Sequence, residues 1–491
     1  MEPEPQPASP KKVFVKGFPN YTQKQDLARV FLDYVKLEKS TVKVEKLNNN
    51  SAVLVFSNED DAVDAVANSG KVNIYGEFLT VKYLTEKDQV ELTSPKRECP
   101  RRKAKDEAII NPKDLDFSGD FHTQLDRILS AVRLTQDEVT ALNTLYADVE
   151  MALQPTWPGC QAIPFGSITT GLGVKTSDAD CFVQIPVHLQ HANDTFVNTA
   201  KQELRKHPKL FGDILTTPKA STPLLKFFHK PSETKCDTTF KSALGINNSK
   251  LIAFLLHADP RILPMAVILK YWAKIHNLSG TTKLKNYALI MLIIFYLQQP
   301  PLSILPSIAW LQRDPASEVI LDSWNAGFMD NYDLLPKSND TSSIQELLGG
   351  FFQYYATFNF EQMVICPFLG YAIKKSSFKD LDLLPEEFKR YKENIENRVA
   401  NRIKFIHTVY ILDPFRLNHN IASPISARLF KVIKLFINFA AVAYENEKLN
   451  NCNGLLKIIL LEKPELPNHN ISVNSALHPH FIMNIIDDDW Q

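Results

Sequence analysis

The stretch Phe165–Gln184, FGSITTGLGVKTSDADCFVQ, combines residue types that suit phosphate and metal chemistry. It opens on a tight turn, Gly166-Ser167, whose backbone N–H groups and hydroxyl are suited to holding phosphate oxygens. Asp178 and Asp180 follow and lead into a short apolar run. Side chains at positions i and i+2 of a strand point to the same face, so we expect these two carboxylates to converge.

Converging carboxylates repel one another unless a cation lies between them, and hard divalent cations prefer oxygen ligands. Hydrogen-bond donors for phosphate oxygens beside such carboxylates are typical of a metal-dependent phosphoryl or nucleotidyl transfer site. The alternative for Asp-x-Asp alone is an acidic strand end at the surface. The Gly-Ser turn at this spacing favours the transfer site, and we expect Mg²⁺ or Mn²⁺ at Asp178 and Asp180.

A third carboxylate, Asp237, lies in the short predicted strand Lys235–Phe240, KCDTTF. A two-metal site needs such a residue on a neighbouring strand, because a second ion must be bridged and the attacking oxygen positioned. An exposed turn aspartate is the alternative interpretation. Asp178, Asp180 and Asp237 are therefore the predicted catalytic and metal-binding residues.

The whole chain is balanced in charge and long enough for two to four domains. Its 491 residues include 55 Lys and Arg and 55 Asp and Glu, so any basic surface must be local. The six cysteines form no CxxC pair and no Cys/His cluster, which argues against a zinc module and for a reducing compartment. The Pro-rich N-terminus resembles no signal or transit peptide. The apolar run Tyr287–Leu297 is too short to span a bilayer, so we expect no membrane partner.

Residues 12–86 show a βαββαβ order that resembles an RNA-recognition motif. The strand VFVKGF fits the first signature of that motif, with Phe14 as the base-stacking and RNA-binding ring. The second signature is degraded, because Ser51 and Val53 stand where stacking aromatics are expected. The alternative is a domain of this fold that docks on protein or binds RNA weakly.

Basic clusters mark the linker predicted at 87–119, at Lys96-Arg97 and at Arg101–Lys105. They suit a nuclear localisation signal or contacts to an RNA backbone, and a merely solvated linker is the alternative. The other expected segments are a disordered start at 1–11, a helix of the central domain at 120–154, a nucleotidyltransferase palm at 155–246, a helical domain at 247–448 and a poorly structured tail at 449–491.

Two helical patterns bear on the site. Thr135 and Glu138 form a capping-box pattern, and we expect the helix that they start to pack on residues after Asn248. Lys270 and Lys274 share a helix face that can meet a triphosphate, although an ordinary solvated face is the alternative.

Residues from about 120 to 450 resemble the terminal RNA nucleotidyltransferases, the poly(A)/poly(U) polymerase-like group of the DNA polymerase beta superfamily. The resemblance rests on several motifs in one order, namely GS…DAD, Asp237, LKYWAK at 269–274, NYAL at 286–289, LLGGFFQYYATF at 347–358 and DPFRLNHN at 413–420. It implies an α+β fold in which the palm is inserted into a mostly helical poly(A)-polymerase-associated domain. The motif at 12–86 narrows it to the nuclear U6 snRNA terminal uridylyltransferases, also called speckle-targeted poly(A) polymerases.

The resemblance implies roles for individual residues. The three aspartates would bind Mg²⁺ and orient the RNA 3′-hydroxyl, and Asn248 would contact the ribose of the nucleotide. Tyr287 would stack on the base, and His419 matches the position that favours uracil over adenine. The other nucleotide-binding positions that it implies are Gly166, Ser167, Lys270, Lys274, Asn286 and Asp413.

Two positions depart from the family pattern. Asn286 stands where many relatives have Ser, and Arg416 stands where several uridylyl-transferring relatives have an acid. The expected function is addition of UMP from UTP to an RNA 3′ end, U6 snRNA being the acceptor that the resemblance suggests. The alternatives are an adenylyltransferase that uses ATP and a non-catalytic RNA-binding scaffold. We expect a monomer in the nucleus, in nucleoplasm, nucleolus or speckles.

Overall fold

The protein forms two compact units, residues 1–106 and 107–491, which we describe separately. The computed structural model describes residues 11–18, 22, 24–34, 41–47, 51–74, 77–85, 88, 110–190, 195–218, 223–280, 282–450 and 453–465. The disordered start, the basic clusters of the linker and the last part of the tail, all predicted from the sequence, lie outside these residues.

The N-terminal unit is a four-stranded antiparallel sheet with strand order β2-β3-β1-β6. Its elements are β1 (Lys12–Lys16), α1 (Lys24–Tyr34), β2 (Val42–Leu47), β3 (Ser51–Phe56), α2 (Glu59–Ala67), the small pair β4 (Asn73–Ile74) and β5 (Glu77–Phe78), and β6 (Thr80–Tyr83). Val13 and Val15 of β1 pack with Leu27 and Phe31 of α1 in one core. This order confirms the predicted βαββαβ arrangement of an RNA-recognition motif.

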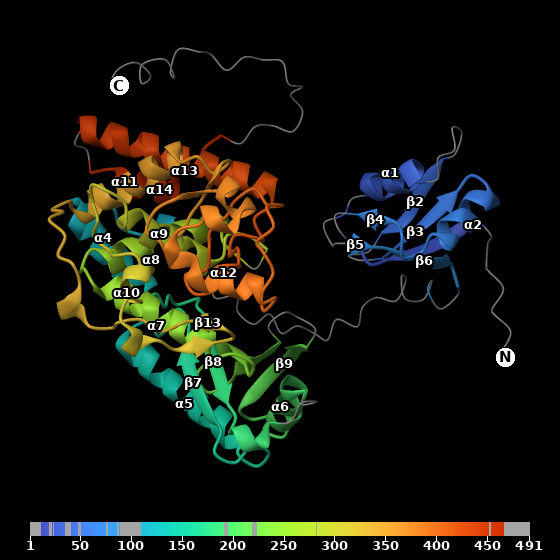
Figure 1. Ribbon diagram of the computed structural model, residues 1–491, viewed down its shortest axis with the longest axis horizontal. Coiled ribbons are helices and arrows are strands. Elements are labelled where there is room, and N and C mark those ends of the chain that lie inside the picture. The colour runs from blue at the N-terminus through green and yellow to red at the C-terminus, as the bar shows by residue number, and fades with distance from the viewer. Residues whose placement is uncertain are drawn as a thin grey trace. The chain divides into compact units, whose positions relative to one another are not determined.

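A five-stranded mixed sheet forms the palm, at the lower end of the larger unit in Figure 1. The strand order is β7-β8-β11-β10-β9, in which only β8 and β11 run parallel. The strands are β7 (Gln161–Phe165), β8 (Ala179–Gln184), β9 (Phe211–Thr217), β10 (Leu224–His229) and β11 (Thr234–Thr239), and the helices are α5 (Gln136–Leu153) and α6 (Phe196–Arg205). Both helices pack against the sheet in one apolar core, which leaves the opposite face for the site.

Helix α5 starts with the predicted capping box, but it belongs to a different core from the one we expected. Thr135 and Glu138 bond each other's backbone N–H groups, as the pattern predicts. The apolar stripe of α5 packs in the palm core rather than on residues after Asn248. The structure divides the central-domain helix predicted at 120–154 into α5 and a preceding helix, α4 (Phe121–Val132). The contact with residues after Asn248 is made by α4, whose buried Phe121 and Ile128 join the helical core. The palm is therefore inserted between α4 and the later helices.

The remaining chain forms a helical domain around one large core, drawn above the palm in Figure 1. Its helices are α7 (Leu244–His257), α8 (Ile262–Ile275), α9 (Asn286–Leu297), α10 (Ile308–Leu311), α11 (Ile344–Thr357), α12 (Lys389–Glu396), α13 (Ala427–Asn450) and α14 (Leu455–Leu461). Two short hairpins are inserted, β12 (Ile320–Leu321) with β13 (Trp324–Asn325), and β14 (Met363–Val364) with β15 (Ile373–Lys374).

The prediction of a poorly structured tail at 449–491 is wrong for residues 455–461, which form a helix. Helix α14 buries Leu455, Leu456, Ile459 and Leu460 in the helical core, because its four leucines and two isoleucines supply an apolar stripe that needs cover.

Helix α9 is buried, as its composition predicts. Among the described helices none is by itself long and apolar enough to cross a membrane, and α7 with α8 passes only as a pair bent by 117°. Cys160, Cys181, Cys236 and Cys366 are buried free thiols.

Gly349 provides a test of how tightly the helical domain is packed. A Cβ atom at this position of α11 would overlap the ring of Tyr444 on α13. Gly349→Ala gains up to about 1 kcal/mol of helix propensity. It should nevertheless lower the free energy of unfolding by a net of about 1–3 kcal/mol, since overpacking a core is costly. Urea denaturation measures the change. Its cost should largely vanish in a Tyr444→Ala background, and an equal cost in both backgrounds would contradict the packing assignment.

Candidate active site

Two of the three predicted catalytic aspartates are direct neighbours on the open face of the palm. Asp180 on β8 is the register partner of Asp237 on β11, and Asp237 is in turn opposite Lys226 on β10. Register partners point to the same face, so these three side chains form one row across the sheet. Asp178 comes immediately before β8 at the rim of this face. The structure therefore brings the predicted carboxylates together.

The electrostatics of the aspartates show that they need a counter-charge. Burial, helped by Asp237 and Asp178, raises the pKa of Asp180 to about 7. Asp178 keeps solvent contact, yet partial desolvation and Asp237 raise its pKa as well. Within the described part of the chain, neither carboxylate accepts a hydrogen bond from a protein donor. Oxygen donors that repel one another and lack protein partners fit a hard divalent cation.

Asp237 is held differently, because Lys226 forms an ion pair with its carboxylate. Among the described residues, no three Asp, Glu, His or Cys side chains are grouped so that they could hold one metal ion. The donor types fit Mg²⁺, and Asp237 becomes available once Lys226 releases it. Lys226 is a site residue that the sequence analysis missed, and its signal is the alternation of β10, which places it on the face of Asp237.

Gly166 supports the site through its lack of a side chain. It has a φ of 83°, and a Cβ atom there would overlap the Asp180 carboxylate. Its N–H donates to Ser249 Oγ at 2.8 Å, so this group is not free for phosphate as we predicted. Ser249 lies on α7 and was not predicted, although its hydroxyl ties the turn to the helical domain. The Ser167 hydroxyl has no partner among the described residues and remains the candidate phosphate ligand.

The two predicted triphosphate lysines contact the loop between the Gly-Ser turn and the aspartates. Lys270 is only 2% exposed, and its ammonium donates to the Leu172 carbonyl at 2.7 Å and to Ser177 Oγ at 3.1 Å. Burial, and secondarily Lys274, lowers the pKa of Lys270 to about 7. Lys274 is half-buried and bonds Thr176. Lys270 therefore positions the loop, and only Lys274 keeps solvent access.

Asn248 has an unused acceptor, as a ligand contact requires. Its Oδ1 atom is buried and has no hydrogen-bond partner among the described residues. A buried polar atom without a partner costs free energy unless a ligand or water satisfies it. Its neighbour Asn247 instead donates to the Ala326 carbonyl at 3.1 Å, which ties α7 to the β12–β13 hairpin region.

The 413–420 motif is organised by Asp413, which is only 4% exposed. One carboxylate oxygen accepts from the N–H groups of Phe415 and Arg416 at 3.0 and 2.9 Å, and the other accepts from the Tyr287 hydroxyl at 3.2 Å. Burial, with Asp413, raises the pKa of Tyr287. Asp413 thus holds the predicted stacking ring against the motif and does not itself face a ligand.

His419 and Asn286 are exposed, so both can meet a ligand as predicted. His419 donates its backbone N–H to the Arg416 carbonyl at 2.8 Å in a tight turn. Protein around the imidazole lowers its pKa by partial desolvation, against an opposing effect of Asp413, and the positive charges of Arg416 and Lys285 lower it further. The ring therefore lies within reach of one acid, Asp413, and of two cations, Arg416 and Lys285.

Phe14 is not available for stacking in the structure. The ring is 2% exposed and packs with Val53 and Leu84, which close the sheet face that carries it. Leu84 follows β6, and this segment is fixed by an ion pair between Lys82 and Asp88 at 2.8 Å. Base stacking by Phe14 therefore stays a prediction, and Leu84, which covers the ring, lies outside the signature strand.

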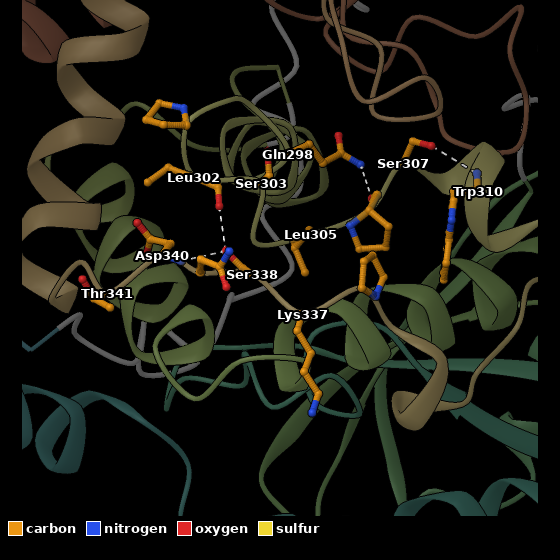
Figure 2. A pocket seen from close by; sticks show the side chains of 14 residues that line it. Gln298, Leu302, Ser303, Leu305, Ser307, Trp310, Lys337, Ser338, Asp340 and Thr341 are labelled. Atoms are coloured by element: carbon orange, nitrogen blue, oxygen red, sulfur yellow. Dashed lines mark hydrogen bonds between the residues drawn. The ribbon is translucent and has the colours of Figure 1, made fainter.

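One cavity of the helical domain lies apart from these residues. It has a volume of about 690 Å³ and contains none of the predicted site side chains. Figure 2 shows its wall, where Gln298 donates to the Pro306 carbonyl and Ser338 donates to the Leu302 carbonyl. The first bond closes the loop after α9 on the end of that helix, and the second ties the loop to residues 336–341.

Comparisons with known proteins match three parts of the chain. Residues 121–256 match the family "Poly(A) RNA polymerase, mitochondrial-like, central palm domain", residues 343–419 match "Cid1 family poly A polymerase", and residues 13–80 match the RNA recognition motif. These matches confirm the resemblance to terminal RNA nucleotidyltransferases and the fold class.

Individual relatives are distant. A speckle targeted PIP5K1A-regulated poly(A) polymerase of Danio rerio is 24% identical over 86% of this chain, and the chain spans only 57% of that relative. The terminal uridylyltransferase cid1 of Schizosaccharomyces pombe is 27% identical over 61% of this chain and 73% of its own length.

Solved structures share the fold. The Cid1 poly(U) polymerase with Mg 3′-dATP bound superposes with a TM-score of 0.56 at 23% identity, over 68% of this chain and 98% of that one. The structure of mtPAP in complex with UTP gives 0.59 at 19% identity, over 92% and 97%.

The raised pKa of Asp180 predicts that the aspartate cluster destabilises the metal-free protein at high pH. The Asp180 carboxyl ionises near pH 4 in the unfolded chain but only near pH 7 in the folded protein. The free energy of unfolding therefore falls as the pH rises through this window. In the presence of a chelator, Asp180→Asn should raise the free energy of unfolding by about 2–4 kcal/mol at pH 8. The gain should disappear near pH 4. Urea titrations at both values measure it, and a gain independent of pH would contradict this account.

Proposed function

We propose that this chain, whose palm and helical domain are those of a poly(A)/poly(U) polymerase-type nucleotidyltransferase, adds nucleotides to the 3′-hydroxyl of RNA without a template. The observation that supports this most directly is the row of Asp180, Asp237 and Lys226 on the open palm face, with Asp178 at its rim. The Gly166-Ser167 turn borders it, and Tyr287 and His419 come from the helical domain.

Each group of residues would do a distinct task. Ser167 and Lys274 would bind the triphosphate, while Asn248 would use its unpaired Oδ1 to accept from a ribose hydroxyl. Tyr287, fixed by Asp413, would support the base. The three aspartates would hold Mg²⁺ or Mn²⁺, which when bound would activate the 3′-hydroxyl and neutralise the leaving pyrophosphate.

We propose UTP as the preferred nucleotide and ATP as the alternative. The exposed imidazole of His419 can donate to the O4 carbonyl of uracil and fill the volume that a purine needs. The curated relatives divide on this point, since one is named a poly(A) polymerase and another a uridylyltransferase. Arg416 beside His419 favours neither base by charge alone, because both bases are neutral.

We propose a nuclear role, which the name of the speckle targeted relative supports. U6 snRNA remains the acceptor that the resemblance suggests. RNA binding by the N-terminal motif through Phe14 would require its cover, Leu84, to move.

Removing the charge of a site aspartate should abolish most of the activity while the protein stays folded. Asp237→Asn keeps the shape of the side chain but removes its charge, and it should lower extension of a 3′-hydroxyl RNA by roughly 10³-fold, several kcal/mol of transition-state stabilisation. Gel analysis with each NTP and Mg²⁺ measures the rate, and circular dichroism checks the fold. The exposed Asp126→Asn on α4 is the matched control and should retain full activity.

Full activity of Asp237→Asn would exclude the palm assignment. If the wild-type chain binds RNA but none of the NTPs supports its extension, the scaffold alternative holds instead.

Base choice provides the second test of this proposal. His419→Ala should raise the use of ATP relative to UTP by about ten- to two-hundred-fold, because it removes a hydrogen bond to uracil and relieves crowding of adenine. Single-nucleotide addition with both nucleotides in competition measures the ratio. His188→Ala, an exposed histidine of the palm, is the control. An unchanged ratio, or a wild type that prefers ATP, would favour the adenylyltransferase alternative.

A further inference from the structure

The segment that follows α12, Asn397–His407 with the sequence NRVANRIKFIH, is the most one-sided in charge near the site. It contains Arg398, Arg402 and Lys404, and residues 397–412 include no Asp or Glu. The whole chain is neutral, with 55 residues of each sign, so this run is a local excess of positive charge.

The basic side chains of this segment are exposed because the residues that alternate with them pack against the protein. Phe405 packs against Phe378 and Tyr410, with ring centroids 5.4 and 4.7 Å apart. The Tyr410 hydroxyl donates to the Lys404 carbonyl at 2.9 Å, and the Ile403 N–H donates to the Tyr391 hydroxyl at 3.2 Å. Ile403 and Phe405 are thereby half-buried, while Arg402, Lys404 and Ile406 face solvent. Ile406 is 77% exposed, so the segment offers apolar surface between its charges.

The positive charges lack protein counter-charges. Of the described residues, none forms an ion pair with Arg398 or Lys404, and Arg402 donates only to the Lys379 carbonyl at 3.1 Å. Basic side chains that remain solvated and unpaired on an ordered segment are free to bind a polyanion.

Arg398 is held in an unfavourable backbone conformation. Its φ is 56°, in the left-handed region that helices commonly use just after their last residue, where Gly is preferred. The N–H groups of Val399 and Ala400 both donate to the Asn394 carbonyl at 2.9 Å, which fixes this ending of α12. Glycine at this position would therefore relieve the backbone strain that Arg398 carries.

The segment is bonded to the motif that carries His419. Asn418 Nδ2 donates to the Asn401 carbonyl at 3.2 Å, so the basic run lies beside the proposed base pocket. A chain whose 3′ end occupies that pocket would pass near these residues.

We propose that Arg398, Arg402 and Lys404 form a binding site for single-stranded RNA, in which they contact the phosphates behind the 3′ end and Ile406 supports a base. This site rests on the proposed function in that RNA is the acceptor. RNA is favoured over an acidic protein because the site adjoins the nucleotide pocket and combines charge with exposed apolar surface.

Binding without NTP or metal tests the proposal separately from catalysis. The variant Arg398→Gly/Lys404→Gln should bind a single-stranded RNA of about 15 nucleotides roughly tenfold more weakly in fluorescence anisotropy. The slope of log affinity against log salt should become shallower by about 1.4, since each phosphate contact contributes about 0.7. Lys431→Gln/Lys457→Gln on α13 and α14 removes the same charge elsewhere and should behave as wild type.

Arg398→Gly alone separates binding from folding. Its thermal midpoint should equal or exceed that of the wild type, because Gly relaxes the left-handed residue, while its RNA affinity should fall. An unchanged affinity and salt slope, or an equal loss in the control variant, would overturn the proposal. Tight binding of a polyglutamate peptide that the variant loses, with RNA affinity unchanged, would overturn it in favour of a protein ligand. A protein that binds RNA as described but extends none would refute the proposed function and leave this site standing.

Discussion

The buried ammonium of Lys270 is the contact on which the arrangement of the site depends. It joins α8 of the helical domain to the loop that runs from the Gly-Ser turn to the aspartates. Such a charge is stable in the interior only because fixed oxygens accept from it, and its lowered pKa shows the cost of its burial. The bond from Gly166 to Ser249 acts at the other end of the loop. Palm and helical domain are thereby held in one relation, and the loop cannot move without breaking buried hydrogen bonds.

The same loop leads into the site aspartates, and Gly166 leaves space for the Asp180 carboxylate because it has no side chain. Asp180 lies against the backbone of Gly166, and Asp237 lies one strand away. Lys226 forms an ion pair with Asp237 and so neutralises part of this charge.

The helical domain contributes position as well as chemistry. Asp413 uses its whole carboxylate inside the protein and so fixes Tyr287 and the turn that carries His419. The basic segment continues from the same motif through Asn401. The proposed nucleotide pocket and the proposed RNA site are thus parts of one hydrogen-bonded unit, whereas the N-terminal motif is a separate compact unit whose Phe14 is covered.

The sequence by itself predicted most of the elements and the class of chemistry. Strand alternation and capping predicted the converging aspartates and the start of α5, because both depend on neighbours within a few residues. The tertiary structure decided which core each helix joins, that Lys270 binds a loop and not a solvated ligand, and that Phe14 is covered by Leu84. These outcomes depend on partners distant in sequence or outside a motif, and a local pattern carries no information about which distant surface a side chain will meet.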